Sequence, residues 1–445
     1  MKKYLLLALL TPLALTTQAF DPLGAYTVAP PQGCVDKNIQ TDELTLADLV
    51  QIGLCTNPSL SAQYMSVKAS EAGLGMSRSS YLPSVTLSGK GNITGEKIEH
   101  TPHYTQNEPY AGTASASWLL FDWGGRSARV DAIRASMEAS QFGYNAALQD
   151  LMLAIQKAYL NALAAKETLT SANASLDTYK QSYTEAQKRY KLGMVSLSDK
   201  LQAQTRYEQA ILAVVLAENQ VKQTSGNLAV LLNLSPTTNL KIAVPEVQQQ
   251  TILLENDDIE ALLKEALQNR PEVRASQAKE QAAKSTLYNT RTKNLPSFTA
   301  NASATYGDNW KKSSPYKTET AAGLSVSMPL FTGFANTYEM QQADYLYKAS
   351  QSNTQNVQLQ IQNEVWASYQ NYHTAYRAYE ISQTVLKSAE ENERVAFRYY
   401  KVGKGDIINL LSAVAQLADA RQNKIAAFYD LLLSKASLYR SIGKY

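Results

Sequence analysis

Two long stretches set the architecture of this chain: residues 148–193, LQDLMLAIQKAYLNALAAKETLTSANASLDTYKQSYTEAQKRYKLG, and residues 196–223, SLSDKLQAQTRYEQAILAVVLAENQVKQ. No proline interrupts residues 123–234, which contain both stretches. Apolar residues in the first stretch recur at alternating steps of four and three, the spacing of helices that pack along their length. These residues are Leu148, Met152, Ile155, Tyr159 and Leu163.

The break between the two stretches predicts a helical hairpin over residues 123–234. Gly193 tolerates the left-handed backbone that ends a helix, and Ser196 or Ser198 can cap the returning helix. The residues from Trp123 to Leu192 would form a helix of roughly 105 Å, far longer than a globular core is deep. The pattern therefore predicts a rod-like hairpin with its tip near residue 193.

The N-terminus has the features of a secretory signal peptide. Lys2 and Lys3 precede an apolar run, and small residues up to Ala19 offer a cleavage site, so we assign residues 1–19 to the signal. The run is too short to span a bilayer, and no later stretch reaches the roughly 18 consecutive apolar residues of a transmembrane helix. The chain is therefore expected to be secreted across the inner membrane.

Charge and cysteine content narrow the environment further. Lys+Arg 42 and Asp+Glu 39 give a net charge of +3, so the composition does not favour a nucleic-acid partner. Cys34 and Cys55 are a candidate disulfide, because secreted proteins fold in oxidising compartments. Two unpaired thiols, or a lipid anchor on Cys34, are the alternatives.

Segments that alternate small or apolar residues with hydroxyl or amide residues precede each long helical region. Alternation of this kind predicts strands with one apolar and one polar face. The predicted strands cover about residues 83–94, 110–121, 296–306 and 320–330.

The second half of the chain repeats the plan of the first. Leu82-Pro83-Ser84 recurs as Leu295-Pro296-Ser297, and the tip glycine Gly193 recurs as Gly403. The second half also has its own long hairpin, over residues 333–441. We therefore predict two structural repeats, residues 20–236 and residues 237–445.

The strands and the signal peptide together indicate an outer-membrane protein. The strands have about the length that a tilted strand needs to cross a bilayer, and strands in lipid must close into a barrel. Four strands are too few, because single-chain barrels begin at eight. We therefore expect an all-α helical tunnel joined to a transmembrane β-barrel of 12 strands. A homotrimer would form both, embedded in the lipid of a Gram-negative outer membrane with a long periplasmic portion.

The chain resembles the TolC-type outer-membrane efflux proteins. The residues that carry the resemblance are LTLADLVQIGLCTNPSL at 44–60, LFDWGG at 120–125, LFTGF at 330–334, RYKLGMVSLSDKLQAQ at 189–204 and RYYKVGKGDIINLLSA at 398–413. The resemblance implies a passive exit duct that docks to a periplasmic adaptor. An inner-membrane ABC exporter or proton-driven pump would supply it, for type I protein secretion or for efflux of drugs and small molecules.

The resemblance also implies a periplasmic gate at the hairpin tips. Tyr400 would bond Asp199 across the two tips, unless Asp199 merely caps a helix. Gly405 stands where the best-known type of the family has a reinforcing arginine, and two aspartates of the narrowest ring are replaced by polar, uncharged residues. Fewer ties and weaker cation selectivity are expected. The candidate gate residues are Asp199, Tyr400, Asp406, Asn409 and Ser412.

The tips resemble the surface on which the family docks its adaptor, although ordinary turn packing is the simpler interpretation. The candidate docking residues are Leu192, Gly193, Met194, Val195, Val402 and Gly403.

No motif in the chain predicts an enzyme. We find no phosphate-binding loop, no nucleophile elbow and no paired-cysteine zinc motif, so no catalytic residue, metal site or cofactor is expected. The rival hypothesis is a secreted coiled-coil structural or adhesive protein without a pore. It accounts for the long helices but not for strand pairs at matching places in both halves.

Overall fold

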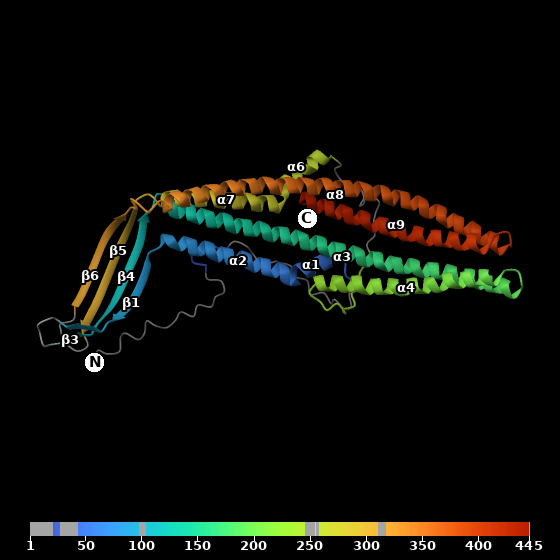
Figure 1. Cartoon of the computed structure of the whole chain (residues 1–445), viewed down its shortest axis with the longest axis horizontal. Coiled ribbons are helices and arrows are strands. Elements are labelled where there is room, and N and C mark those ends of the chain that lie inside the picture. The colour runs from blue at the N-terminus through green and yellow to red at the C-terminus, as the bar shows by residue number, and fades with distance from the viewer. Residues whose placement is uncertain are drawn as a thin grey trace. The chain divides into compact units, whose positions relative to one another are not determined.

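The computed structural model describes residues 21–26, 43–97, 104–244, 254, 258–309 and 317–444. These residues form two compact units. The first consists mainly of Lys68–Met137 and Gln281–Leu346, with residues 21–26. The second consists of Glu138–Glu280 and Tyr347–Tyr445 together with residues 43–67. Two long helices, α3 (Gly125–Lys191) and α8 (Ala335–Lys401), contribute residues to both units (Figure 1).

The first unit contains an antiparallel sheet of four strands in the order β1-β4-β5-β6. Its strands are β1 (Ser84–Gly91), β4 (Pro109–Phe121), β5 (Ser297–Asn309) and β6 (Lys317–Ser327). The pairing of β4 with β5 joins the two halves of the chain. A separate ribbon consists of β2 (Thr94–Lys97) and β3 (Tyr104–Asn107).

The strand ends differ from the prediction in several places: β5 runs to Asn309, three residues past the predicted end, and β6 starts at Lys317, three residues before the predicted start. The first predicted strand divides, because β1 stops at Gly91 and residues 94–97 pair with β3 instead. The last predicted strand was to reach residue 330, but β6 ends at Ser327, two residues before Pro329. Proline has no N–H to donate to a neighbouring strand, so it ends the pairing.

The strand register gathers hydroxyl and amide side chains on one face of the sheet. On that face Thr113 Oγ1 lies 3.1 Å from Thr305 Oγ1, and Ser117 Oγ donates to Asn301 Oδ1 over 3.0 Å. The opposite face carries Val85, Ala116, Ala302 and Ala322 in one row across the four strands. The alternation in the sequence therefore produces one polar and one apolar face.

Each strand pair leads into its long helix through a turn of two left-handed residues, one aromatic and one glycine, in opposite order in the two halves. Trp123 and Gly124 have φ of 56° and 84°, and Gly333 and Phe334 have φ of 64° and 65°. Glycine adopts a left-handed conformation easily, whereas the aromatic residue of each turn is strained in it. The helices begin after these turns, two residues later than predicted.

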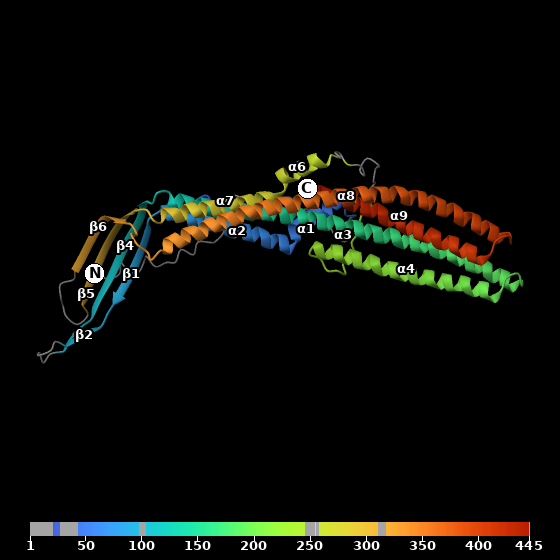
Figure 2. The ribbon, with the colours of Figure 1, turned by 45° about the horizontal axis from the view of Figure 1, so that its top comes forward.

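The helices of the second unit form two hairpins, α3 with α4 and α8 with α9. In both views α7 lies alongside α8 (Figures 1 and 2), and Thr354 Oγ1 donates to Ser276 O between them. Besides α3 and α8, the α-helices among the described residues are α1 (Leu46–Thr56), α2 (Pro58–Arg78, which enters the first unit), α4 (Leu197–Leu231), α6 (Ile259–Asn269), α7 (Pro271–Thr292, shared by both units) and α9 (Ile407–Ile442).

Small residues at seven-residue intervals let the hairpin helices pack closely. In α4 these buried residues are Ala203, Ala210 and Ala217, and in α9 they are Ala413 and Ala420. A seven-residue repeat keeps one face of a helix against its partner over many turns. The predicted coiled-coil packing is thus based on alanine in the returning helices.

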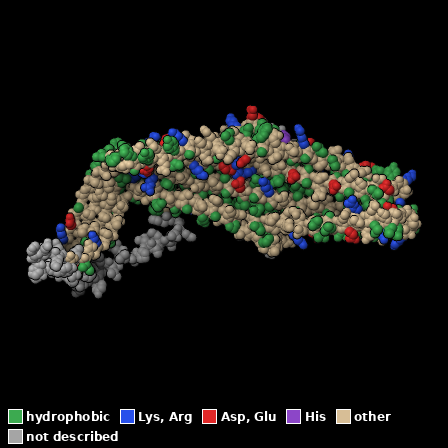
Figure 3. Space-filling model, viewed as in Figure 1, with side chains coloured by type: hydrophobic (Ala, Val, Ile, Leu, Met, Phe, Trp, Pro, Cys, Tyr) green, Lys and Arg blue, Asp and Glu red, His purple; other side chains and the backbone are tan. Residues whose placement is uncertain are grey.

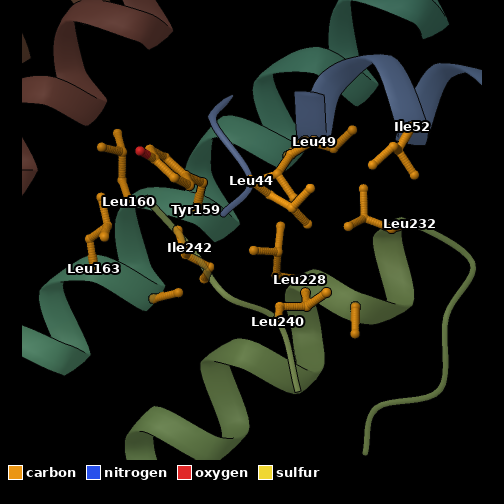
Figure 4. Close-up of a cluster of buried hydrophobic side chains, with 13 residues drawn as sticks. Leu44, Leu49, Ile52, Tyr159, Leu160, Leu163, Leu228, Leu232, Leu240 and Ile242 are labelled. Atoms are coloured by element: carbon orange, nitrogen blue, oxygen red, sulfur yellow. The ribbon is translucent and has the colours of Figure 1, made fainter. Parts of the chain in front are cut away.

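A larger apolar core surrounds the middle of α3. Ile155, Tyr159 and Leu163, three residues of the pattern found in the sequence, are buried there. Figure 4 shows side chains from α1, α3, α4 and the segment around Ile242 converging on this core. No helix in the described ranges combines the length and apolar content that a membrane crossing requires.

Candidate gate at the hairpin tips

Both hairpins turn at a glycine in the left-handed conformation. Gly193 has φ of 71°, and Met194 N donates to Arg189 O over 2.9 Å; Gly403 has φ of 78°, and Lys404 N donates to Tyr399 O over 3.0 Å. These bonds satisfy carbonyls that a helix end leaves free, as in a Schellman motif. The two predicted tip glycines therefore end α3 and α8.

Three of the predicted gate residues serve first as helix caps. Asp199 accepts from Ser196 N over 3.0 Å, while Asp199 N donates to Ser196 Oγ over 3.1 Å, which forms a capping box at the start of α4. At the start of α9, Asp406 accepts from the backbone N and the side-chain Nδ2 of Asn409, each over 2.7 Å. The side chains of Asp199, Asp406 and Asn409 are thus occupied at the start of their own helices.

The predicted bond between Tyr400 and Asp199 is not formed in this structure. Tyr400 is 1% exposed, and its hydroxyl has no hydrogen-bond partner among the described residues. Burial raises the pKa of Tyr400, and the nearby Arg189 guanidinium partly offsets this effect. The alternative role of Asp199, as a helix cap, is the one observed.

Arg189, which was not among the predicted gate residues, makes a polar contact between the tips, beside an apolar cluster that both hairpins share. Its guanidinium carbon lies 4.6 Å from the centre of the Tyr400 ring, and its Nη2 donates to Lys401 O over 2.9 Å. Glu185, one turn earlier in α3, lies 3.5 Å from Arg189 Nε. The position of Arg189 in the last turn of a helix was a usable signal, since basic residues there reach terminal carbonyls.

The backbone around Gly405 leaves little space for the arginine that the best-known type of the family has at this position. A Cβ at this position would lie 3.1 Å from Tyr400 N and 3.3 Å from the carbonyl carbon of Tyr399. Gly405 N also donates to Tyr399 O over 3.1 Å. The second tip loop folds so closely onto the end of α8 that a larger residue requires it to shift.

Ser412 lines a groove of about 860 Å³ between the first turns of α4 and α9. Leu201, Thr205 and Ile408 line it too, and Arg206 adds one charged side chain. Asn409 is exposed beside this groove and holds Asp406. The structure therefore keeps Asp406, Asn409 and Ser412 together at the start of α9.

The tip loops expose apolar side chains. Leu192 is 74% exposed, Met194 62% and Val402 67%, whereas Val195 is partly buried. Figure 3 shows hydrophobic and charged side chains together at the tip end of the long helices. Such an exposed apolar group with charged neighbours is suited to contact with another protein.

Other predicted sites lie elsewhere or outside the described residues. Cys55 is disulfide-bonded in α1, and Cys34 lies outside the described residues. Within the part of the chain that the structure describes, no three His, Cys, Asp or Glu residues are grouped to hold a metal ion.

Comparison with known proteins assigns the family. The family model described as "Outer membrane efflux protein" matches residues 49–234 and 262–444. Protein CyaE of Bordetella pertussis is 27% identical over 431 residues, which cover 96% of this chain and 90% of that protein. Outer membrane protein TolC of Vibrio cholerae is 26% identical over 377 residues, covering 82% of this chain and 83% of that protein.

A solved structure shows the same fold. The outer-membrane channel OprN superposes with a TM-score of 0.80 at 17% identity, over 94% of this chain and 99% of that chain. The mostly helical fold with added strands is therefore that of TolC-like channels, as predicted. The chain belongs to the outer membrane efflux protein family, and its function is that of an exit duct in a Gram-negative outer membrane, for efflux or secretion.

Proposed function

We propose that three copies of this chain close one barrel of 12 strands in the outer membrane. The observation that supports this most directly is the sheet of four strands, whose outer members β1 and β6 each lack a second partner among the described strands. Unpaired strand edges are prohibitively costly in lipid, and four strands are too few to close. Three copies of this sheet supply 12 strands, a number within the range of strand numbers known for closed transmembrane barrels.

The two faces of the sheet then have separate roles. The apolar face, with Val85, Ala116 and Ala302, contacts outer-membrane lipid, and the face with Thr113, Ser117 and Asn301 lines the water-filled interior. The hairpins continue the same interior into the periplasm. The polar interior suits a passive duct that accepts varied cargo.

The two halves of the chain act as structural repeats, residues 20–236 and residues 237–445. The matching left-handed turns support this, and so do the hairpins, with helices of 67 and 35 residues in one half and 67 and 36 in the other. Gly193 and Gly403 place the two tips at the same end of these hairpins. A homotrimer therefore presents six similar tips around one opening.

These tips are where a periplasmic adaptor docks and where the duct narrows. The exposed Leu192, Met194 and Val402 supply the adaptor contact, and Asp406, Asn409 and Ser412 surround the opening. An inner-membrane ABC exporter or a proton-driven pump supplies the cargo. Type I protein secretion and small-molecule efflux both fit a polar, unspecialised wall.

Cell fractionation and conductance measurements test this function. The mature chain should sit in the outer membrane as a trimer in mild detergent, and it should conduct ions in a planar lipid bilayer. A water-soluble monomer without conductance would instead support the rival, a secreted coiled-coil structural or adhesive protein. An adaptor captured by the wild-type tips, and lost with Leu192→Asp and Val402→Asp, would support the docking assignment.

A further inference from the structure

Near their tips the two hairpins share a buried apolar cluster that includes Ala186, Tyr400 and Leu410. One buried charged side chain also reaches from the first hairpin to the second. Arg189 belongs to α3, and its Nη2 donates to the carbonyl of Lys401, the last residue of α8, over 2.9 Å. The last carbonyls of a helix lack partners within the helix and form the negative end of its dipole. A cation at this point therefore caps the helix of the other hairpin.

The surroundings of Arg189 hold its guanidinium in this position. The Tyr400 ring lies beneath it at 4.6 Å, and Glu185 approaches its Nε from the same helix at 3.5 Å. A guanidinium over an aromatic face is attracted more strongly when both groups are withdrawn from water, and both are buried here. Arg189 is thus held by three groups, two of which belong to the opposite hairpin.

We propose that Arg189 ties the two hairpins of each protomer together at the tips, and that breaking this tie widens the duct. The inference rests on the proposed function, since it concerns the narrow end of that duct. It assigns the tie to the Tyr400 ring and the Lys401 carbonyl, and not to the hydroxyl of Tyr400.

The Tyr400 hydroxyl supports this assignment independently. It is buried without a hydrogen-bond partner among the described residues, so the tip with Arg189 in place carries an unmet polar group. A buried polar group without a partner favours any state in which water reaches it. Removing the hydroxyl should therefore favour the tip arrangement seen here. If the hydroxyl instead clasped Asp199, the same change would favour opening.

Single-channel recording of trimers in planar lipid bilayers tests the tie. Arg189→Ala should increase the ratio of wide to narrow states about tenfold or more, the range set by loss of one charge-assisted hydrogen bond. Lys188→Ala removes the same charge from an exposed neighbour and should leave the recording unchanged. Tyr400→Leu should widen the duct, and Tyr400→Phe should not.

Two results would overturn the proposal while leaving the duct in place. One is a conducting wild type whose Arg189→Ala and Lys188→Ala variants behave alike. The other is Tyr400→Phe widening the duct as much as Arg189→Ala. Should Arg189→Ala fail to assemble, Arg189→Lys is the second variant, because lysine keeps the charge but cannot stack on the Tyr400 ring as the planar guanidinium does. The Arg189→Lys duct should be wider than wild type but narrower than expected for Arg189→Ala. An Arg189→Lys duct no wider than that of Lys188→Ala would overturn the tie. Trimers that never conduct, wild type included, would remove the duct itself.

Discussion

The Nη2 atom of Arg440 lies 2.5 Å from Oε1 of Glu272, which joins the end of α9 to the start of α7. Arg270, between α6 and α7, pairs with the same carboxylate over 2.8 Å, and Arg440 Nε donates to Asp150 of α3 over 2.9 Å. Both arginines are buried. Glu272 is thus the carboxylate that both buried arginines share, while Asp150 pairs with Arg440 alone and Glu364 with Arg270 alone.

Glu272→Gln should destabilise the protein by about 3 kcal/mol, because it leaves two buried guanidinium groups without their shared charge. Thermal unfolding of the purified trimer measures the loss. Glu364→Gln is the matched control, since Glu364 pairs with Arg270 from a side chain that is 55% exposed. A cost below about 1 kcal/mol is expected there. Equal losses in the two variants would contradict the central role of Glu272.

The ion pairs of Glu272 with Arg270 and Arg440 predict that the folded protein loses stability in acid. Hydrogen bonds from Arg270 and Arg440 outweigh burial and lower the pKa of Glu272 from 4.5 to about 2. A lowered pKa means that this stabilisation is complete above about pH 4.5 and is lost as the pH falls towards 2. Unfolding measured across this window should show a steeper loss of stability in the wild type than in Glu272→Gln. Parallel curves would rule out this carboxylate as the source.

Gly124→Ala should cost about 1 kcal/mol, because Gly124 has φ of 84° and a Cβ is strained in that region. Gly143→Ala, inside α3, is the opposite case. Nothing lies within 4 Å of a Cβ at Gly143, so alanine there should stabilise α3 by about 1 kcal/mol. Thermal unfolding of the two variants should move in opposite directions, and a shared direction would be inconsistent with this account.

Gly405→Arg should loosen the second tip, although it introduces the arginine that the best-known type of the family has at this position. The new Cβ would crowd Tyr400 N at 3.1 Å and displace the loop. We expect a loss of about 1 kcal/mol and a wider duct in single-channel recordings. Val195→Arg, at the matching position of the first tip, already has a Cβ and serves as the control. A narrower duct in Gly405→Arg would show that the loop accommodates arginine.

Asn409→Asp should raise the preference of the duct for cations, because it adds one carboxylate per protomer near the proposed opening. Reversal potentials across a salt gradient measure this preference. The gain should weaken at high salt, where exposed charges are screened. A wild type with strong cation preference that Asn409→Ala abolishes would contradict the expectation of an uncharged opening.

Much of the fold could be predicted because its signals are local. Gly193 and Gly403 end their helices through their own backbone, and Ser196 with Asp199 caps α4 within four residues. The start of the long helices was misplaced by two residues, because nothing in the sequence marks Trp123 and Phe334 as left-handed. Aromatic residues rarely adopt that conformation, so only the three-dimensional structure of the turn reveals it.

The candidate site was less predictable, since a side chain chooses among partners that the chain brings near it. Asp199 had two possible roles, a cap and a clasp, and the cap is the one observed. Arg189 and Lys401 are separated by 212 positions, and no short motif relates them. Their contact exists because two hairpins from different halves of the chain pack at the same tip.

The amino-acid sequence alone determined the helical hairpins, the alternating strands and the tip turns, because periodicity, caps and glycine conformations act over a few residues. The tertiary structure alone decided that β4 pairs with β5, that Arg189 lies over Tyr400 and that Glu272 balances two arginines. Each of these contacts joins residues from distant parts of the chain, and their energies depend on burial that exists only after the segments have packed.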